Sequence, residues 1–247
     1  MKVARFLHEG REIGGRLEDG MLASYDGRRY DPSKVRWLPP CRPQNIIGLV
    51  LNYADHADEL GLSITEDPVI FMKPTSALLG HLEPVVRPKG ARFMHFEGEL
   101  AVVIGSDCRK ATAESAMEHV WGYAPANDLT VRDYITNTFR PPIRAKGFDT
   151  FCPIGPYLTT ADEISNPGDL SIETRVNGEA RQESSTRMFL HSIPKVIAFI
   201  SSFMTLRRGD VILTGTPKGI SPLVPGDVVE VTVEKCGTLR NGVVDET

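Results

Sequence analysis

The sequence predicts a β-rich α+β fold with a small β appendage at its N-terminus. Three observations lead to this prediction: strand-like apolar segments outnumber helical ones, no regular alternation of strands and helices persists, and a proline-rich stretch follows the first forty residues. A doubly wound parallel sheet needs such alternation and is not expected. We expect a small β domain at residues 1–42 and one main domain at residues 43–247, because the chain is long enough to bury a sizeable core.

The N-terminal segment shows the punctuation of small hairpins. Gly14–Gly15, Asp19–Gly20 and Asp26–Gly27 separate short segments of mixed polarity, and such dipeptides are typical of tight turns. The run PPCRP at residues 39–43 predicts a linker, because consecutive prolines disfavour both helix and central strand.

The main domain is predicted to contain mostly strands. Two helices are expected, Ala113–Trp121 and Pro194–Leu206, and NYADHADELG predicts a short helix or turn closed by Gly61. Asn241–Gly242 predicts a terminal hairpin. The strand candidates are 46–51, 69–73, 84–86, 99–105, the segment before Asp128, 172–176, 211–215 and 228–234.

Composition favours a cytoplasmic protein that acts on small molecules. A net charge of −4 gives no electrostatic reason to expect nucleic acid. The apolar runs are far shorter than the roughly 20 residues of a membrane span, and the N-terminus has no signal-peptide core. The cysteines are scattered, which predicts reduced thiols and argues against a zinc knuckle or disulfide framework; they are Cys41, Cys108, Cys152 and Cys236.

Three acidic residues form the candidate metal site. Glu97 and Glu99 in FEGELAVVIG are two positions apart, so an extended chain directs both carboxylates to the same side. Asp128 follows another strand-like segment, and no histidine or cysteine has comparable ligand spacing. Oxygen ligands of this kind suit Mg²⁺ or Mn²⁺. The alternative is a solvent-facing strand edge with an unrelated turn acid.

A histidine and a glutamate form a second candidate cluster. His56 and Glu59 are three residues apart in NYADHADE, so a helical turn places them on one face. A carboxylate beside an imidazole fixes its tautomer and raises its basicity, which predicts a general base. A helix-surface histidine is the alternative. The remaining histidines are expected to be structural, with His95 the least secure because it lies two residues before Glu97.

Two further segments predict anion binding. Arg140, Arg144 and Lys146 lie in a proline-rich loop whose cations could hold an anionic substrate, although a solvated loop is the alternative. Thr214 and Thr216 lie in TGTPKG after an apolar strand, where hydroxyls and backbone N–H groups could cradle a carboxylate. This turn is not a P-loop, since the Gly-Lys-Ser/Thr ending is missing.

In this order, the motifs resemble the fumarylacetoacetate hydrolase family over residues 45–245. They are NYADHADELG, VIFMKPTSALLG, MHFEGELAVVIG, GYAPANDLTVRDY, RAKGFD, RVNGEARQ and RRGDVILTGTPKGIS. The resemblance implies a mixed β-roll and a small carboxylic acid substrate. It also implies a homodimer.

The resemblance further implies roles for individual residues. Glu97, Glu99 and Asp128 would ligate Mg²⁺ or Mn²⁺, and His56 with Glu59 would form a catalytic dyad on a lid. Lys146 would lie near the metal as a third catalytic residue. Thr216 would contact the substrate.

Within the family, VRDYITNTFRPPIRAKGFDTFCPIGP is most similar to enzymes of 4-hydroxyphenylacetate (homoprotocatechuate) catabolism. This implies a metal-dependent decarboxylase and isomerase acting on a 2-oxo or 2-hydroxydienoate di- or tricarboxylic acid. A hydrolase of acylpyruvates or of fumarylacetoacetate-like diketones and an oxaloacetate decarboxylase are the enzymatic alternatives. A metal-stabilised binding protein without turnover is an alternative of another class.

Overall fold

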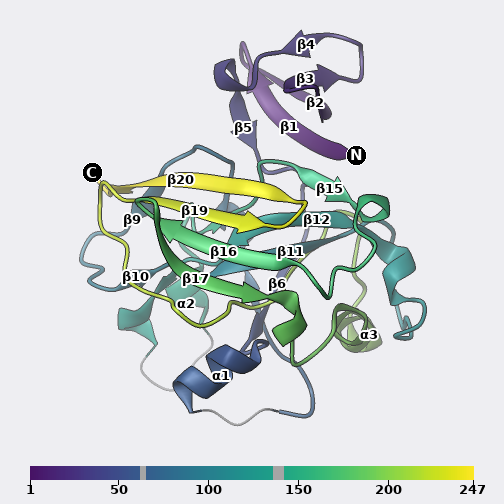
Figure 1. Ribbon diagram of the computed structural model, residues 1–247, viewed down its shortest axis with the longest axis vertical. Coiled ribbons are helices and arrows are strands. Elements are labelled where there is room, and N and C mark those ends of the chain that lie inside the picture. Colours follow the sequence, from purple (N-terminus) through teal and green to yellow (C-terminus); the bar gives the residue numbers. More distant parts are fainter. Residues whose placement is uncertain (62–64, 136–141) are drawn as a thin grey trace.

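The computed structural model describes residues 1–61, 65–135 and 142–247, and the fold is dominated by two β-sheets (Figure 1). The larger sheet has eleven strands in the order β4-β3-β2-β1-β15-β12-β11-β18-β6-β7, with β5 paired to β1. Its strands are β1 (Lys2–His8), β2 (Arg11–Glu18), β3 (Met21–Ser24), β4 (Arg29–Tyr30), β5 (Arg36–Leu38), β6 (Ile46–Val50), β7 (Val69–Lys73), β11 (Gly98–Ile104), β12 (Val120–Asn127), β15 (Leu158–Thr160) and β18 (Val211–Leu213).

The second sheet has five strands in the order β17-β16-β19-β20-β9 and lies in front of β11 and β12 in Figure 1. Both sheets are mixed: β18 runs parallel to β6 and β20 runs parallel to β9, whereas their other pairs are antiparallel. The strands of this sheet and of two short ribbons are β8 (Leu78–Leu79), β9 (Val85–Arg87), β10 (Met94–His95), β13 (Thr130–Val131), β14 (Cys152–Pro153), β16 (Ser171–Val176), β17 (Glu179–Ser185), β19 (Val228–Val233) and β20 (Gly237–Asp245).

Helices are short among the described residues. They are α1 (Ala54–Leu60), α2 (Ile143–Lys146) and α3 (Ile193–Phe203), with 3-10 turns η1 (Pro32–Lys34), η2 (Thr75–Ala77), η3 (Ala116–His119), η4 (Arg132–Tyr134), η5 (Ala161–Glu163) and η6 (Thr186–Met188). Gly61 ends α1 in the left-handed conformation, with φ of 62°, as expected for a glycine C-cap. The balance of many strands and few helices confirms the predicted β-rich α+β class.

Strand β11 is the centre of the fold because both of its faces are buried. Ala101 and Val103 belong to one apolar core, which also contains residues of β12 and β18. Leu100, Val102 and Ile104 point to the opposite face and join a second core, which is covered by α3. Alternation along a strand explains this division. An acidic side chain at the start of β11 is therefore held by rigid, densely packed surroundings.

The N-terminal strands have a small core of their own and also extend the large sheet. Phe6, Leu22 and Trp37 pack together with Tyr157 of the main domain. Strand β1 pairs with β15 through Lys2–Thr159 and Val3–Leu158. The division of the chain into domains at residues 1–42 and 43–247 remains a prediction, since a sheet runs across it.

The helix predicted at Ala113–Trp121 is wrong. Only Ala116–His119 form a 3-10 turn, and β12 begins at Val120. The helix-favouring segment is too short to be stable alone, whereas Val120 and Tyr123 are β-formers that pair with β11. The second predicted helix is confirmed as α3, which begins one residue before Pro194 and ends three before Leu206.

Two predicted turns are also wrong. Asn241–Gly242 lies inside β20, where the two residues pair with Val229 and Val228, and the chain reverses near Lys235 instead. The Asn241 amide donates to two backbone carbonyls, so this asparagine is a buried structural residue.

Gly14–Gly15 likewise lies inside a strand, β2, and the turn before it is Glu9–Gly10. A Cβ on Gly15 would come within 2.3 Å of the Ala23 carbonyl oxygen, so close strand approach explains this glycine. Asp19–Gly20 is a turn as predicted, since both residues have positive φ between β2 and β3.

Two expectations about the whole chain can be compared with the structure. Among residues 1–61, 65–135 and 142–247, no helix has the length and apolar character required to cross a membrane. All four cysteines are free and buried, in agreement with the prediction of reduced thiols.

Gly98 lies directly against the second sheet at the predicted site. A Cβ on this residue would lie 2.0 Å from Oγ1 of Thr174 and 3.0 Å from Oε1 of Gln182, both buried residues of the second sheet. Gly98 also separates Glu97 from Glu99. The absence of a side chain therefore allows the second sheet to reach the backbone between two candidate metal ligands.

We predict that Gly98→Ala destabilises the protein by about 1–3 kcal/mol, because overpacking forces neighbouring side chains from their positions. The free energy of urea unfolding is the measurement. Gly242→Ala is the matched control, since Gly242 also lies in a strand and a Cβ there meets nothing within 4 Å. Equal stability of the two variants would show that the sheets are not tightly packed at Gly98.

Candidate metal centre and active site

The structure brings the three predicted acidic residues together in the interior. Carboxylate oxygens of Glu97, Glu99 and Asp128 all lie within 4.8 Å of one another. The residues are 6%, 1% and 0% exposed, respectively. The alternative of a solvent-facing strand edge is therefore excluded for these side chains.

Antiparallel pairing of β11 with β12 explains why the acids converge. Gly98 pairs with Asn127, so the ends of the two strands that carry Glu97 and Asp128 are neighbours. The Asp128 N–H donates to the Glu97 carbonyl at 2.9 Å, and the Glu97 N–H donates to Oδ1 of Asn127 at 3.0 Å. These bonds fix the backbone on both sides, and alternation along the chain then places Glu99 beside Glu97.

Lys146 lies at the acidic cluster, as expected. Its Nζ donates to Oε2 of Glu97 at 2.8 Å, to Oδ2 of Asp128 at 2.5 Å and to the Thr130 hydroxyl at 2.8 Å. The residue is only 6% exposed, and Nζ also lies 5.0 Å from the centre of the Phe71 ring. Lys146 is the last residue of the short helix α2, so this helix contributes a buried cation rather than a surface charge.

Two cations that the sequence did not single out complete the cluster. Lys73, at the end of β7, donates to Oδ1 of Asp128 at 2.6 Å, and the two side chains are fully buried. The Arg132 guanidinium pairs with Oε1 of Glu97, which also accepts from the Thr130 hydroxyl at 2.9 Å. Three carboxylates thus face three cationic side chains, and buried charges need such pairing.

The acids differ strongly in their affinity for a proton. Burial opposes ionisation of Glu97, but Lys146 and Arg132 outweigh it and lower the pKa of Glu97 to about 2. Burial, together with the charges of Asp128 and Glu97, raises the pKa of Glu99 well above its usual value. Burial disfavours the Lys146 cation, yet the same two carboxylates raise its pKa above the ordinary 10.5. Without a further cation, Glu99 is the residue that retains a proton.

The donor set fits a hard divalent ion. Carboxylate oxygens of the three residues lie within 4.8 Å of one another, close enough for one ion to contact all three. The ligands are all oxygens, which favours Mg²⁺ or Mn²⁺ over zinc or copper. A doubly charged ion would also replace the proton on Glu99.

The predicted dyad forms as helical spacing requires. On α1, Nδ1 of His56 lies 2.9 Å from Oε2 of Glu59, and His56 is 6% exposed. A carboxylate only accepts hydrogen bonds, so Nδ1 carries the hydrogen and Nε2 presents a lone pair. The other oxygen, Oε1 of Glu59, accepts from the Gly219 N–H at 3.3 Å, which joins the helix to the TGTPKG turn.

Two groups of the TGTPKG turn that were expected to cradle a substrate carboxylate instead bind other groups of the protein. The Gly215 N–H donates to Oε2 of Glu99 at 2.7 Å, so this backbone group holds a candidate metal ligand. The Thr214 hydroxyl donates to the Leu100 carbonyl at 2.8 Å. Thr216 is buried and its oxygen accepts from the Gln182 amide at 2.8 Å, so its own hydrogen is not used in this contact.

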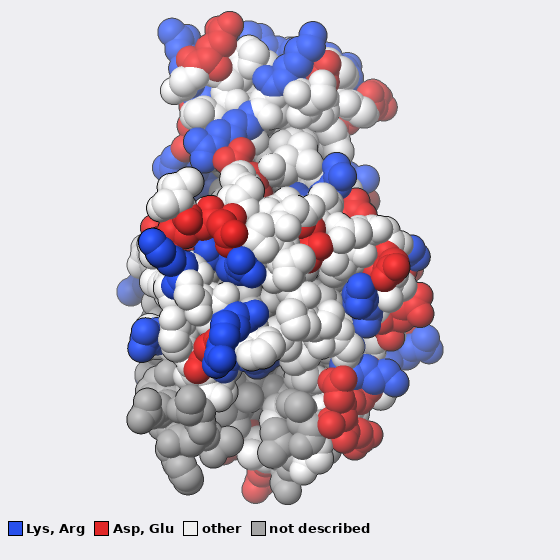
Figure 2. Space-filling model, turned by 90° about the vertical axis from the view of Figure 1, so that its left-hand side faces the viewer, with Lys and Arg blue, Asp and Glu red and all other residues white. Residues whose placement is uncertain are grey.

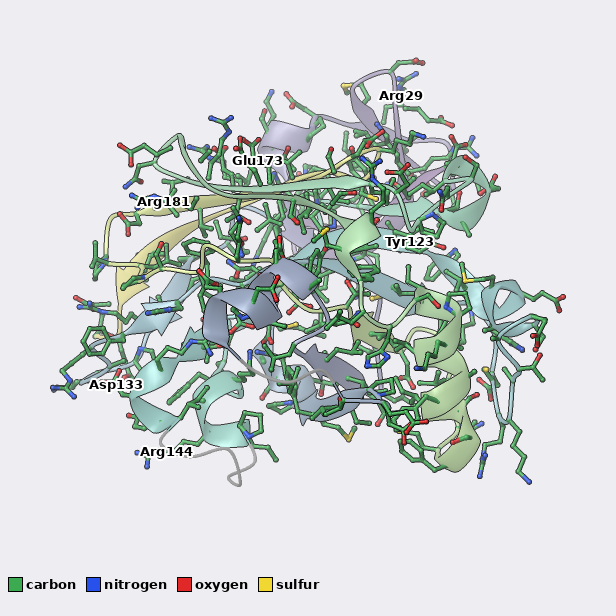
Figure 3. All side chains as sticks on the ribbon, turned by 60° about the horizontal axis from the view of Figure 1, so that its bottom comes forward. Arg29, Tyr123, Asp133, Arg144, Glu173 and Arg181 are labelled. Atoms are coloured by element: carbon green, nitrogen blue, oxygen red, sulfur yellow. The ribbon has the colours of Figure 1, made fainter. Side chains whose placement is uncertain are left out.

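Arg144, one of the two predicted substrate-binding arginines, is not part of the acidic cluster. Arg144 is exposed on α2, and its guanidinium lies 4.0 Å from the centre of the Tyr134 ring. Figure 3 shows Arg144 at the edge of the molecule. Arg140 lies outside the described residues. A substrate role for either residue remains a prediction.

Two surface cavities differ in their relation to this site. One of about 400 Å³ lies beside the dyad and is lined by Glu59, Arg181, Glu183, Lys218 and Gly219, among others. A larger one of about 810 Å³ lies near the start of α3 and contains none of the predicted site residues. We consider the cavity beside the dyad the relevant one, because Glu59 lines it.

Basic and acidic side chains are mixed on the face that carries β9 and β10 (Figure 2).

Signals for the missed cations are present in the sequence. Arg132 follows Asp128 by four residues in NDLTVRD, and Lys73 ends the apolar strand VIFMK on the same face as Phe71. A lysine on the buried face of a strand needs a buried anion, which is the clue that links Lys73 to Asp128.

Comparison with known proteins assigns the chain to one family. Residues 45–244 match the fumarylacetoacetate hydrolase C-terminal family. The bifunctional isomerase/decarboxylase of 4-hydroxyphenylacetate degradation from Salmonella dublin is 45% identical over 201 residues, which are 81% of this chain and 47% of that protein. The chain thus spans about half the length of this relative.

Two solved structures share the whole fold. The 5-carboxymethyl-2-hydroxymuconate delta-isomerase of Mycobacterium smegmatis is 40% identical, with a TM-score of 0.91 and complete coverage of both chains. The maleylpyruvate hydrolase of Sphingobium sp. SYK-6, solved with manganese(II) and pyruvate, is 31% identical, with a TM-score of 0.87 and complete coverage of both chains. These matches confirm the resemblance, and the chain belongs to the fumarylacetoacetate hydrolase family of metal-dependent enzymes.

Proposed function

We propose that this protein is a divalent-metal-dependent decarboxylase and isomerase of 2-oxo or 2-hydroxydienoate di- and tricarboxylic acids in 4-hydroxyphenylacetate catabolism. The observation that carries the proposal is the buried cluster of Glu97, Glu99 and Asp128 with three surrounding cations. The names of the Salmonella relative and of the Mycobacterium structure favour this chemistry over other activities of the family.

Electrostatics favour a substrate with several carboxylates. The three carboxylates are balanced by Lys73, Lys146 and Arg132, so a bound divalent ion would leave the site with a net positive charge. Such a site attracts an anion whose carboxylate and adjacent oxygen can bind together. Arg181 and Lys218 line the cavity beside the dyad and are candidates for the distal carboxylates, in addition to Arg140 and Arg144.

We propose that Glu97, Glu99 and Asp128 hold Mg²⁺ or Mn²⁺. When bound, the ion supplies a fixed positive charge that stabilises negative charge on the substrate oxygen during loss of carbon dioxide or enolisation. Lys146 and Arg132 keep two of the ligand residues in place, and the Gly215 N–H orients the third.

The dyad is suited to move a proton along the substrate. Nε2 of His56 has its lone pair available because Glu59 accepts the hydrogen on Nδ1. It can take the enol proton and return it at a distal carbon, which converts a dienol into the keto tautomer. The Gly219 N–H donates to Glu59, and the Ser184 hydroxyl donates to Asp55, so α1 is attached to the TGTPKG turn and to β17. With the helix fixed in this way over a bound substrate, the access of water would be limited.

A hydrolase is the second candidate function. The maleylpyruvate hydrolase has the same fold, and in the same site the dyad would activate water to cleave a carbon–carbon bond. Oxaloacetate decarboxylation is a narrower version of the first proposal. Binding without turnover is disfavoured, because the chain belongs to a family of enzymes. A homodimer and a cytoplasmic location complete the proposal and follow from the family resemblance and the composition.

We predict that the purified protein with Mg²⁺ or Mn²⁺ releases carbon dioxide from 5-oxopent-3-ene-1,2,5-tricarboxylate and isomerises 2-hydroxyhepta-2,4-diene-1,7-dioate. Chelation of the ion should abolish both reactions. The measurements are carbon dioxide release and ultraviolet absorbance of the conjugated substrate, with acylpyruvate and oxaloacetate tested in parallel. Pyruvate formed by carbon–carbon cleavage without carbon dioxide would favour the hydrolase instead.

We predict that metal binding strengthens as pH rises. The raised pKa of Glu99 means that the folded, metal-free protein holds a proton that the ion must displace, so apparent affinity should rise up to about tenfold per pH unit below that pKa. Calorimetry in buffers of different ionisation enthalpy would measure the released proton.

The same shift has a consequence for stability. Between the ordinary pKa of 4.5 and the raised one, the folded state binds more protons than the unfolded state. Stability of the metal-free protein should therefore fall as pH rises through this window. Thermal melting checks this, and Glu99→Gln, which has no proton to lose, is the control. A metal-free melting temperature with the same pH dependence in both proteins would contradict the assignment.

We predict that His56→Gln lowers kcat of the isomerase by about 10²- to 10⁴-fold, the usual contribution of acid–base catalysis. Metal affinity should stay unchanged, since in the described residues the His56 side chain is hydrogen-bonded to Glu59 and to none of the three acids. The control is His119→Gln, because His119 bonds only Ser106 at the surface of the described structure. Full activity of His56→Gln would remove the dyad from the mechanism.

A further inference from the structure

Gln182 is a buried residue that connects the candidate metal ligands with the TGTPKG turn at residues 214–219, the proposed substrate turn. It lies on β17 of the second sheet and is 2% exposed. Its Oε1 accepts from the Gly98 N–H at 3.1 Å. Its Nε2 donates to the Thr216 hydroxyl oxygen at 2.8 Å and to the Pro217 carbonyl at 2.8 Å. One side chain therefore touches the backbone between Glu97 and Glu99 and also two residues of TGTPKG.

The orientation of this amide is fixed by its backbone partners. The Gly98 N–H can only donate, so the group facing it must be the oxygen. The Pro217 carbonyl can only accept, so the group facing it must be the nitrogen. Both requirements are met by the same orientation of the Gln182 amide. In the reversed orientation, the Gln182 NH₂ group would face the Gly98 N–H, and the Gln182 oxygen would face the Pro217 carbonyl oxygen.

The fixed amide determines the polarity of the Thr216 hydroxyl. This hydroxyl accepts a hydrogen from Nε2 of Gln182, and a hydroxyl has one hydrogen to donate. That hydrogen must point away from Gln182. The neighbouring Thr214 provides a contrast, because its hydrogen is donated to the Leu100 carbonyl and is not available to a ligand.

We propose that Gln182 is a positioning residue that makes the Thr216 hydroxyl a hydrogen-bond donor to the substrate carboxylate. The inference rests on the proposed function, in which Thr216 contacts the substrate. A carboxylate only accepts hydrogen bonds, so a hydroxyl presented with the opposite polarity would repel it. The bond to Gly98 holds the same amide at a fixed position relative to the metal ligands.

The surrounding fold is built to hold this amide. Thr174 pairs with Gln182 across β16 and β17, and a bulge follows at Thr174–Arg175. Gly98 has no Cβ, which leaves room for Oε1 of Gln182 to reach its N–H. Figure 3 labels Glu173 and Arg181, which flank this pair and lie on the same sheet. The exposed Arg181 and the buried Gln182 thus alternate along β17.

The test exchanges the amide for a carboxylate of the same shape. In Gln182→Glu the side chain can accept the Thr216 hydrogen, so the hydroxyl turns its lone pairs toward the substrate. Oxalate, a stable dicarboxylate, is the probe, and its affinity is measured by calorimetry at saturating Mn²⁺. We expect the variant to bind oxalate about 10- to 100-fold more weakly, the size of one hydrogen bond to an ion.

A double-mutant cycle with Thr216→Val separates polarity from charge. The added negative charge repels oxalate whether or not the hydroxyl is present, whereas the polarity effect needs the hydroxyl. We expect Gln182→Glu to cost much less in the Thr216→Val background. In the Thr216→Ser background, which keeps the hydroxyl, the full cost of Gln182→Glu should persist. An equal cost in the wild-type and Thr216→Val backgrounds would overturn the inference.

Two further measurements protect the interpretation. The electron paramagnetic resonance spectrum of bound Mn²⁺ should remain that of the wild type, since the polarity of Thr216 does not alter the ligands. Gln182→Met removes the polar contacts of the amide without adding charge, and it should weaken oxalate binding by a smaller factor. This variant replaces Gln182→Glu in the test if the carboxylate variant does not fold. Unchanged oxalate binding in Gln182→Met would also overturn the inference. Unchanged binding in Thr216→Val would instead contradict the substrate contact in the proposed function.

Discussion

Charge balance among buried carboxylates is the constraint on which this structure depends. Glu97, Glu99 and Asp128 lie within a few ångströms of each other in the interior, where like charges repel strongly. Lys146 bridges Glu97 and Asp128, and Lys73 donates to the other carboxylate oxygen of Asp128. Burial and the charges of Asp128 and Glu97 raise the pKa of the remaining acid, Glu99. The total charge of the cluster is balanced by three cations, yet within the described residues no cationic side chain donates to Glu99, so a divalent ion would fit beside it.

This constraint explains why the site uses so many parts of the chain. A single strand cannot provide three acids and three cations on one face, so β7, β11, α2, η4 and the turn after β12 each contribute one or two. They meet because β11 is packed on both faces and pairs with β12 and β18. Glycine at 98 then allows the second sheet to approach, and Gln182 transmits the position of the acids to the substrate turn.

Spacing in the sequence predicted the pairs with local partners, and the family resemblance indicated that Lys146 lies near the metal, but the contacts of Lys73 and Gln182 were missed. Glu97 with Glu99, and His56 with Glu59, are spaced by strand and helix periods, so short-range geometry was sufficient. Lys73 and Gln182 act on residues 55 and 84 positions away, and only the folded sheet order reveals these contacts. The wrong helix at Ala113–Trp121 has the same cause, because pairing with β11 outweighed local helix preference.

The division between decarboxylation and hydrolysis depends on what reaches the substrate beside the dyad. One relative is named an isomerase/decarboxylase and one structure of the same fold a hydrolase, so the shared fold alone does not determine the reaction. His56 can return a proton to carbon only if water does not compete for the same position. The Gly219 N–H holds Glu59, and the Ser184 hydroxyl holds Asp55, so α1 is attached to both the substrate turn and the second sheet. Attachment at two points fixes the helix that carries His56 and Glu59. In the proposed function, a fixed dyad favours proton transfer along the carbon chain over attack by water.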